Sequence, residues 1–79
     1  MNKNEFVSQL SDFCEFENEN FTLETMFKSI NGYDSLAIMS IIAFVDENFK
    51  MSLTASQLSR ITDFNSLIEL IGIDKFENA

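Results

Sequence analysis

The side chain best placed for chemistry in this sequence is the hydroxyl of Ser35, in the segment Gly32-Tyr33-Asp34-Ser35-Leu36. Helical apolar spacing begins here, so Ser35 falls in the first turn of a predicted helix. A hydroxyl at that position points outward beside backbone N–H groups that have no acceptor within the helix. The helix dipole would stabilise an anion attached there by roughly 0.3–1 kcal/mol. Taken alone, Asp-Ser before an apolar helix is an ordinary N-terminal cap.

The composition does not support catalysis at this serine. The chain contains no histidine, which removes the usual general base that activates a serine hydroxyl. With no histidine and Cys14 as the single cysteine, no residue set has the pattern of a zinc site. Cys14 also permits no internal disulfide, and we expect it to be a buried small hydrophobe. We therefore expect no enzyme activity, no catalytic residue and no metal.

Length and hydrophobicity indicate one small folded domain, spanning residues 1–79. A chain of 79 residues has a thin core, and 46% hydrophobic residues are too many for a disordered chain. No apolar run approaches the ~18 residues that a membrane span requires. The polar N-terminus also differs from a secretory signal. These features predict a cytoplasmic protein, and the amino-acid usage is typical of an AT-rich bacterial genome.

The charge balance argues against nucleic acid as a partner. Thirteen acidic and five basic residues give a net charge of −8, whereas nucleic-acid phosphates require clustered Lys and Arg. An acidic surface favours partner proteins with basic surfaces, because opposite fields speed encounter. We expect protein partners, no nucleic acid, no membrane, and a monomer.

The apolar spacing predicts four helices, at about residues 3–14, 35–49, 55–60 and 63–71. The fold class is therefore all-α, a small four-helix bundle with a short third helix. A long first loop, acidic over residues 15–20, separates the first two helices. Capping signals mark three of the starts: Asn2 with Glu5, Thr54 with Gln57, and Thr62 or Asp63. Gly72 ends the last helix.

Apolar residues at helical spacing predict which side chains face the core. In the first helix these are Phe6, Val7, Leu10, Phe13 and Cys14. In the connection that follows, the inward set is drawn from Leu23, Met26, Phe27 and Ile30. The core stripe of the second helix is Ile38, Ile41, Ile42, Val45 and Phe49. A second apolar patch lies off this stripe, with Asp46 and Glu47 beside it: Leu36, Met39 and Ala43.

With these elements in place, the chain resembles the acyl carrier protein family. That family has Asp-Ser-Leu at the start of its second helix, closely preceded by glycine, as in Asp34, Ser35 and Leu36 after Gly32. The pattern continues without a gap to Ile71. Upstream, a phenylalanine eight residues before the serine, Phe27 here, is usually buried in the family. The resemblance covers the chain and is strongest over its C-terminal half.

The resemblance implies that Ser35 accepts 4′-phosphopantetheine from coenzyme A, attached covalently by a phosphopantetheinyl transferase. The thiol of the arm would then hold an acyl or aminoacyl intermediate as a thioester. A loading ligase would supply the intermediate, and downstream transferases or synthases of fatty-acid or polyketide type would consume it. Asp34 would be read by the transferase, and Gly32 would let the chain turn tightly into the helix. The docking patch would be Leu36, Met39 and Ala43, with Asp46 and Glu47 contacting basic partner residues.

The chain departs from housekeeping fatty-acid carriers in the charge of its second helix. Those carriers have several acidic residues after the Asp-Ser-Leu motif, whereas residues 37–40 here read Ala-Ile-Met-Ser and acid returns only at Asp46. Asn31 and Thr54 replace a usual Leu and a frequent Pro. A less charged face favours apolar docking and predicts a carrier for a specialised pathway, such as a polyketide, a lipid or a modified surface sugar. The alternative is an unmodified helical adaptor on a carrier-like scaffold.

Overall fold

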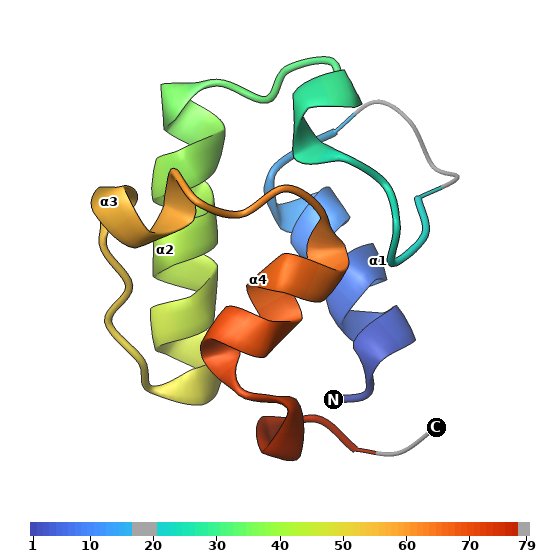
Figure 1. Cartoon of the computed structure of the whole chain (residues 1–79), viewed down its shortest axis with the longest axis vertical. Helices are drawn as coiled ribbons and strands as arrows, with labels where there is room; N and C mark the ends of the chain where they lie inside the picture. The colour runs from blue at the N-terminus through green and yellow to red at the C-terminus, as the bar shows by residue number, and fades with distance from the viewer. Residues whose placement is uncertain (17–20, 78–79) are drawn as a thin grey trace.

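The computed structural model describes residues 1–16 and 21–77, and Figure 1 shows the arrangement of their helices. The four α-helices are α1 (Lys3–Phe13), α2 (Ser35–Phe49), α3 (Ala55–Leu58) and α4 (Phe64–Ile71). Two 3-10 turns accompany them, η1 (Phe27–Ser29) and η2 (Ile73–Lys75). Within residues 1–16 and 21–77 no strand occurs, so the predicted all-α fold with four helices and a short third is confirmed.

The predicted helix limits agree with the observed ones to within two residues, the usual uncertainty of a helix end. The two predicted capping boxes are present, formed by Asn2 with Glu5 and by Thr54 with Gln57. Asp63, and not Thr62, caps α4: its Oδ1 accepts a hydrogen bond of 2.9 Å from the Ser66 N–H. Most of the predicted acidic loop at 15–20 lies outside the described residues.

The helix α2 contacts both α1 and α3. In Figure 1, α2 forms one side of the molecule, α1 the other, and α4 crosses between them. The turn η2 brings the chain back toward its start, where the Glu77 N–H donates a hydrogen bond of 3.1 Å to the Met1 carbonyl. The radius of gyration is 11.4 Å, close to the ~11.6 Å expected of one folded unit of this length.

The core is rich in phenylalanine rings, which form two groups at opposite ends of α2. Near the end of α2, the Phe6 ring lies 5.8 Å from Phe44, 5.9 Å from Phe49 and 5.2 Å from Phe76. Such edge-to-face contacts stabilise the core beyond the burial of ring area alone.

The second ring group lies at the beginning of α2. Here the Phe27 ring lies 5.2 Å from Tyr33 and 4.6 Å from Phe64. The Phe21 ring also lies near Phe64, at 6.0 Å. Phe27, eight residues before Ser35, is only 1% exposed, as the resemblance to the carrier family implies.

The residues of α2 that face the core are not all those of the predicted core stripe. Ile41 and Val45 are buried as expected, and the other buried positions are Ala37 and Phe44. The remaining stripe residues are only half-buried and lie at the margin of the core: Ile38, Ile42 and Phe49. Because α2 is apolar on most sides, its periodicity could not identify the innermost direction, which the packing against α1 and α3 decides.

Phe13, which was expected to face the core, is 45% exposed, and so is Met26, one of the four residues from which the inward set of the connection was drawn. Phe13 is the last residue of α1, and one side of its ring contacts Phe44 at 5.5 Å while the rest meets solvent. Met26 pairs with Asp63 in an isolated bridge that turns the next residue, Phe27, into the core. Conversely, Phe16 and Phe76 are buried although no periodic pattern included them.

Candidate functional site

Ser35 is the first residue of α2, and its side chain is exposed to solvent. Asp34 is the N-cap, with φ −137° and ψ −168°. Its Oδ1 accepts a hydrogen bond of 3.0 Å from the Ala37 N–H. The N–H groups of Ser35 and Leu36 have no acceptor within the helix, because helical bonding begins only in the next turn. The observed geometry therefore presents an exposed hydroxyl at the positive end of a 15-residue helix.

The turn that leads into Ser35 is attached to the core by aromatic stacking. Gly32 adopts φ +88°, in the left-handed region, and the Tyr33 ring stacks on Phe27 with an interplanar angle of 23°. The Phe27 N–H in turn donates a hydrogen bond of 2.9 Å to the Thr62 carbonyl. This chain of contacts joins the start of α2 to the segment that precedes α4.

Tyr33 was not among the residues predicted for the site. Its ring supports the turn, and burial raises the pKa of its hydroxyl, with a smaller contribution from the nearby Cys14. The available signal was an aromatic residue between a glycine and a helix cap, six residues after Phe27. That signal alone could not identify which ring it contacts.

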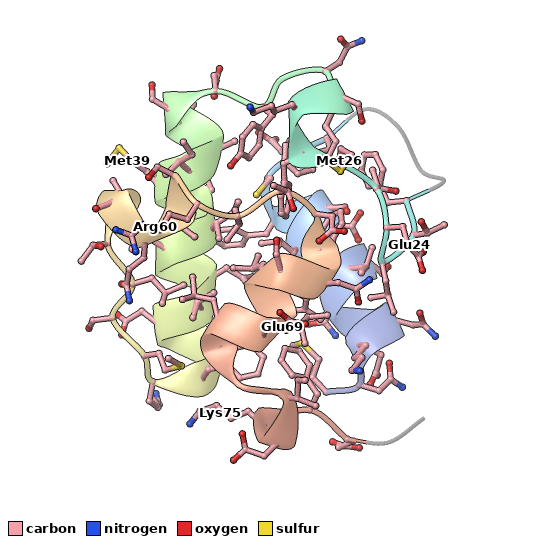
Figure 2. All side chains as sticks on the ribbon, in the orientation of Figure 1. Glu24, Met26, Met39, Arg60, Glu69 and Lys75 are labelled. Carbon is pink, nitrogen blue, oxygen red and sulfur yellow. The ribbon has the colours of Figure 1, made fainter. Side chains whose placement is uncertain are left out.

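The predicted second patch of α2 is exposed, and we call Leu36, Met39 and Ala43 the apolar face. Leu36 is 71% exposed and Met39 is 66% exposed. At about 100° per residue the three positions span roughly 60° of the helix, and Ser35 lies about 40° from Met39. Figure 2 shows Met39 projecting from the outer side of α2 near its beginning. The structure thus brings the apolar face together with Ser35.

Asp46 and Glu47 are exposed in the last turns of α2. At about 1.5 Å per residue, they lie roughly 17–18 Å along the helix from Ser35. The apolar face occupies the length between them and Ser35. A protein whose active groups reach the Ser35 hydroxyl would therefore contact the apolar face before it reached these two carboxylates.

Cys14 provides no reactive thiol beside the site. It is half-buried, and burial raises its pKa to about 11, so the thiol stays protonated at neutral pH. Within residues 1–16 and 21–77 no three His, Cys, Asp or Glu side chains gather to hold a metal ion. None of the described helices has both the length and the apolar character needed to cross a membrane.

Two surface hollows of about 400 Å³ each lie away from α2. One is formed by α1 with the segment around Phe21, and its lining includes Asn4, Ser8 and Asp12. The other lies between α3 and α4, with charges from Arg60 and Glu69 at its edge (Figure 2). Neither is lined by Ser35 or by any other residue of α2.

The comparisons with known proteins give no relative for this arrangement. No family model, no curated protein and no solved structure matches the chain.

Proposed function

We propose that this protein is a carrier of acyl-carrier type, whose Ser35 receives a 4′-phosphopantetheine arm from coenzyme A. The observation that supports this most directly is the exposed Ser35 hydroxyl at the first position of α2, immediately beside the apolar face. When bound, the arm supplies a thiol that holds an acyl or aminoacyl group as a thioester. The protein itself catalyses no reaction.

The residues around Ser35 fit such an arm. In the attachment step the Ser35 oxygen would bond to the phosphorus that carries pantetheine, while the pyrophosphate P–O bond of coenzyme A breaks and adenosine 3′,5′-bisphosphate and the hydroxyl proton leave. The resulting linkage is a phosphodiester, an anion that the N-terminus of α2 stabilises by roughly 0.3–1 kcal/mol. The N–H groups of Ser35 and Leu36 are available to it, while the Asp34 carboxylate is engaged with the Ala37 N–H. Open solvent around Ser35 leaves room for both the arm and the transferase that attaches it.

The rest of the chain positions the attachment point and presents the tethered group to partner enzymes. The stacked Tyr33 and Phe27 join the segment before Ser35 to the core. A group tethered there reaches each partner enzyme at a high effective concentration without dissociating. The partners are a phosphopantetheinyl transferase, a loading ligase, and downstream transferases or synthases, which we place in the bacterial cytoplasm.

The apolar face supports a specialised pathway over housekeeping fatty-acid synthesis. Leu36 and Met39 are the most exposed large apolar side chains of the described residues, and no acidic residue intervenes before Asp46. Docking on such a face depends on shape and apolar burial more than on charge. The same face also suits the second candidate, an unmodified helical adaptor that binds partners without an arm.

Intact mass measurement tests the proposal. The purified protein is incubated with coenzyme A and a broad-specificity phosphopantetheinyl transferase, alongside Ser35→Ala and the matched control Ser56→Ala. Ser56 is an exposed serine in α3. We expect one added arm on the wild type and on Ser56→Ala, and none on Ser35→Ala. If the folded wild type gains no arm, even with the transferase of its source organism, the carrier is ruled out and the adaptor is favoured.

A further inference from the structure

We infer that this carrier holds its cargo outside the helical bundle, and that the cargo is therefore a short or polar acyl group, such as an aminoacyl group. A long hydrocarbon chain does not fit this protein. The inference rests on the proposed attachment at Ser35, and it concerns what the arm carries.

The interior beneath Ser35 is filled by a row of aromatic rings. Tyr33, two residues before Ser35, stacks on Phe27 at 5.2 Å, and Phe27 lies 4.6 Å from Phe64. Phe21 continues the row at 6.0 Å from Phe64. Phe27 is 1% exposed and Phe64 is fully buried. The region nearest the arm is thus occupied by side chains of the protein itself.

The interior beside this row is equally closed. The inward residues of α2 nearest Ser35, Ala37 and Ile41, are 4% and 0% exposed. The side chains that α3 and α4 direct into the core are no more than 2% exposed: Leu58, Phe64, Leu67, Ile68 and Ile71. Protein interiors at this degree of burial are packed as densely as organic crystals. A guest chain would have to displace some of these groups.

The side chains that could make room are not in the core. Methionine is the residue that adapts best to a changing neighbour, because it is unbranched and has three rotatable bonds. Met26 and Met39 are exposed, while Met1 and Met51 lie only at the margin of the core. Aromatic rings, by contrast, have only two side-chain torsions and cannot shorten. The core of this protein therefore resists a long apolar guest.

Neither of the two hollows described above extends to Ser35, because neither is lined by a residue of α2. The apolar face beside Ser35 is an exposed apolar surface near the arm, and a chain lying on it would block the docking of partners. A short or polar cargo avoids this conflict because it exposes little apolar area and can remain in solvent without covering the apolar face.

The test is to vary the cargo length on the same protein. The transferase loads the wild type with acetyl-, butyryl-, octanoyl- or dodecanoyl-coenzyme A, and the melting temperature of each product is measured at two protein concentrations. We expect melting temperatures within about 2 °C of one another at low concentration. Hydroxylamine should cleave the thioesters of the four loaded forms at rates within about twofold of one another. Association of the dodecanoyl form at higher concentration would also place its chain outside.

A rise of roughly 5 °C or more from the acetyl to the dodecanoyl form would overturn the inference, because burial of the chain in the folded state would stabilise it. So would protection of the longer thioesters from hydroxylamine by about tenfold. If no form of the arm can be attached, the proposed function fails instead, and that result is visible by mass before any melting is measured.

A pair of core variants tests the role of the ring row. Phe27→Leu removes a ring next to the arm, whereas Phe6→Leu removes an equally buried ring from the other group. We expect a melting temperature that rises with cargo length in Phe27→Leu and stays level in Phe6→Leu. Phe64→Leu replaces Phe27→Leu if the latter does not fold. Level responses in all of these variants would contradict exclusion by the rings.

Discussion

The backbone of Gly32 has φ +88°, and a Cβ placed on it would meet no heavy atom within 4 Å. Space is therefore available for a side chain, and the conformation alone requires glycine. We expect Gly32→Ala to lower the free energy of unfolding by about 1 kcal/mol. Gly32→Asn should cost less, because Asn tolerates left-handed backbone better. Urea denaturation measures both, and an unchanged or raised stability of Gly32→Ala would refute the argument.

The thiol of Cys14 differs between the folded and unfolded chain. Burial raises its pKa from an ordinary value of 9.0 to about 11 in the folded chain, so at pH 8 about 100-fold less thiolate is present in the folded protein. We expect iodoacetamide to alkylate the native protein at least tenfold more slowly than the urea-unfolded protein. Equal rates would show that the thiol is accessible and unperturbed.

The same shift predicts a loss of stability at alkaline pH. The folded chain keeps the Cys14 proton where the unfolded chain has lost it. The resulting stabilisation is complete below about pH 9 and disappears as the pH rises toward about 11. Tyr33 acts in the same direction, since burial raises its pKa too. Melting temperatures from pH 8 to 11 should therefore fall less steeply in Cys14→Ala than in the wild type, and parallel curves would exclude this role.

At the scale of elements, α2 has two faces with separate roles. Ala37, Ile41 and Phe44 direct one face into the core, while Leu36 and Met39 leave the opposite face in solvent. The acidic residues stand at the far end of the helix from Ser35. This distribution predicts that the apolar face contributes more than charge to partner docking.

Attachment of the arm by the transferase provides the measurement. We expect Met39→Asp to lower kcat/KM for the carrier by about tenfold or more, because it introduces a charge into the apolar contact. The double charge reversal Asp46→Lys with Glu47→Lys should have a smaller effect. All three side chains are exposed, so both variants should fold, which circular dichroism checks. The opposite order of effects would mean that charge directs docking.

The N-terminal cap of α4, Asp63, can be tested by substitution. Asp63 satisfies the Ser66 N–H, and replacement of such a cap by alanine typically costs about 1 kcal/mol. We expect Asp63→Ala to lower the melting temperature by about 4–8 °C. Thr62→Ala is the matched control, because Thr62 joins the hydrogen bonds to Phe27 and Ser66 through its backbone. A larger loss in Thr62→Ala would mean that the cap is assigned to the wrong residue.

At the scale of the whole molecule, Phe76 closes the end of the bundle opposite Ser35. Its ring lies 5.2 Å from Phe6 and 5.1 Å from Phe49, and it is 8% exposed. We expect Phe76→Ala to destabilise the protein by about 3 kcal/mol, a large share of the total for so small a domain. Ile73→Ala, at a 56% exposed position in η2, should change stability by less than about 0.5 kcal/mol. Similar small losses for both would show that the C-terminal turn contributes little.

The features that could be predicted from the sequence are those made by neighbouring residues. The capping boxes at Asn2 and Thr54 join residues three positions apart, and helix periodicity repeats every three or four positions. The place of Ser35 at the start of a helix follows from the same short-range rules. These local signals sufficed for the all-α fold, whereas the choice of Ser35 as the candidate site rested on the resemblance to the acyl carrier protein family.

Only the tertiary structure decided which side of α2 is innermost and which rings lie behind Ser35. Tyr33 stacks on Phe27, and the Phe27 N–H donates a hydrogen bond to the carbonyl of Thr62, a residue far along the chain. Phe76 likewise lies beyond the last periodic segment, yet it packs on Phe6 near the other end of the sequence. Such contacts join residues that no spacing rule relates. They form because burying the rings removes apolar area from water, and that gain depends on how the helices meet.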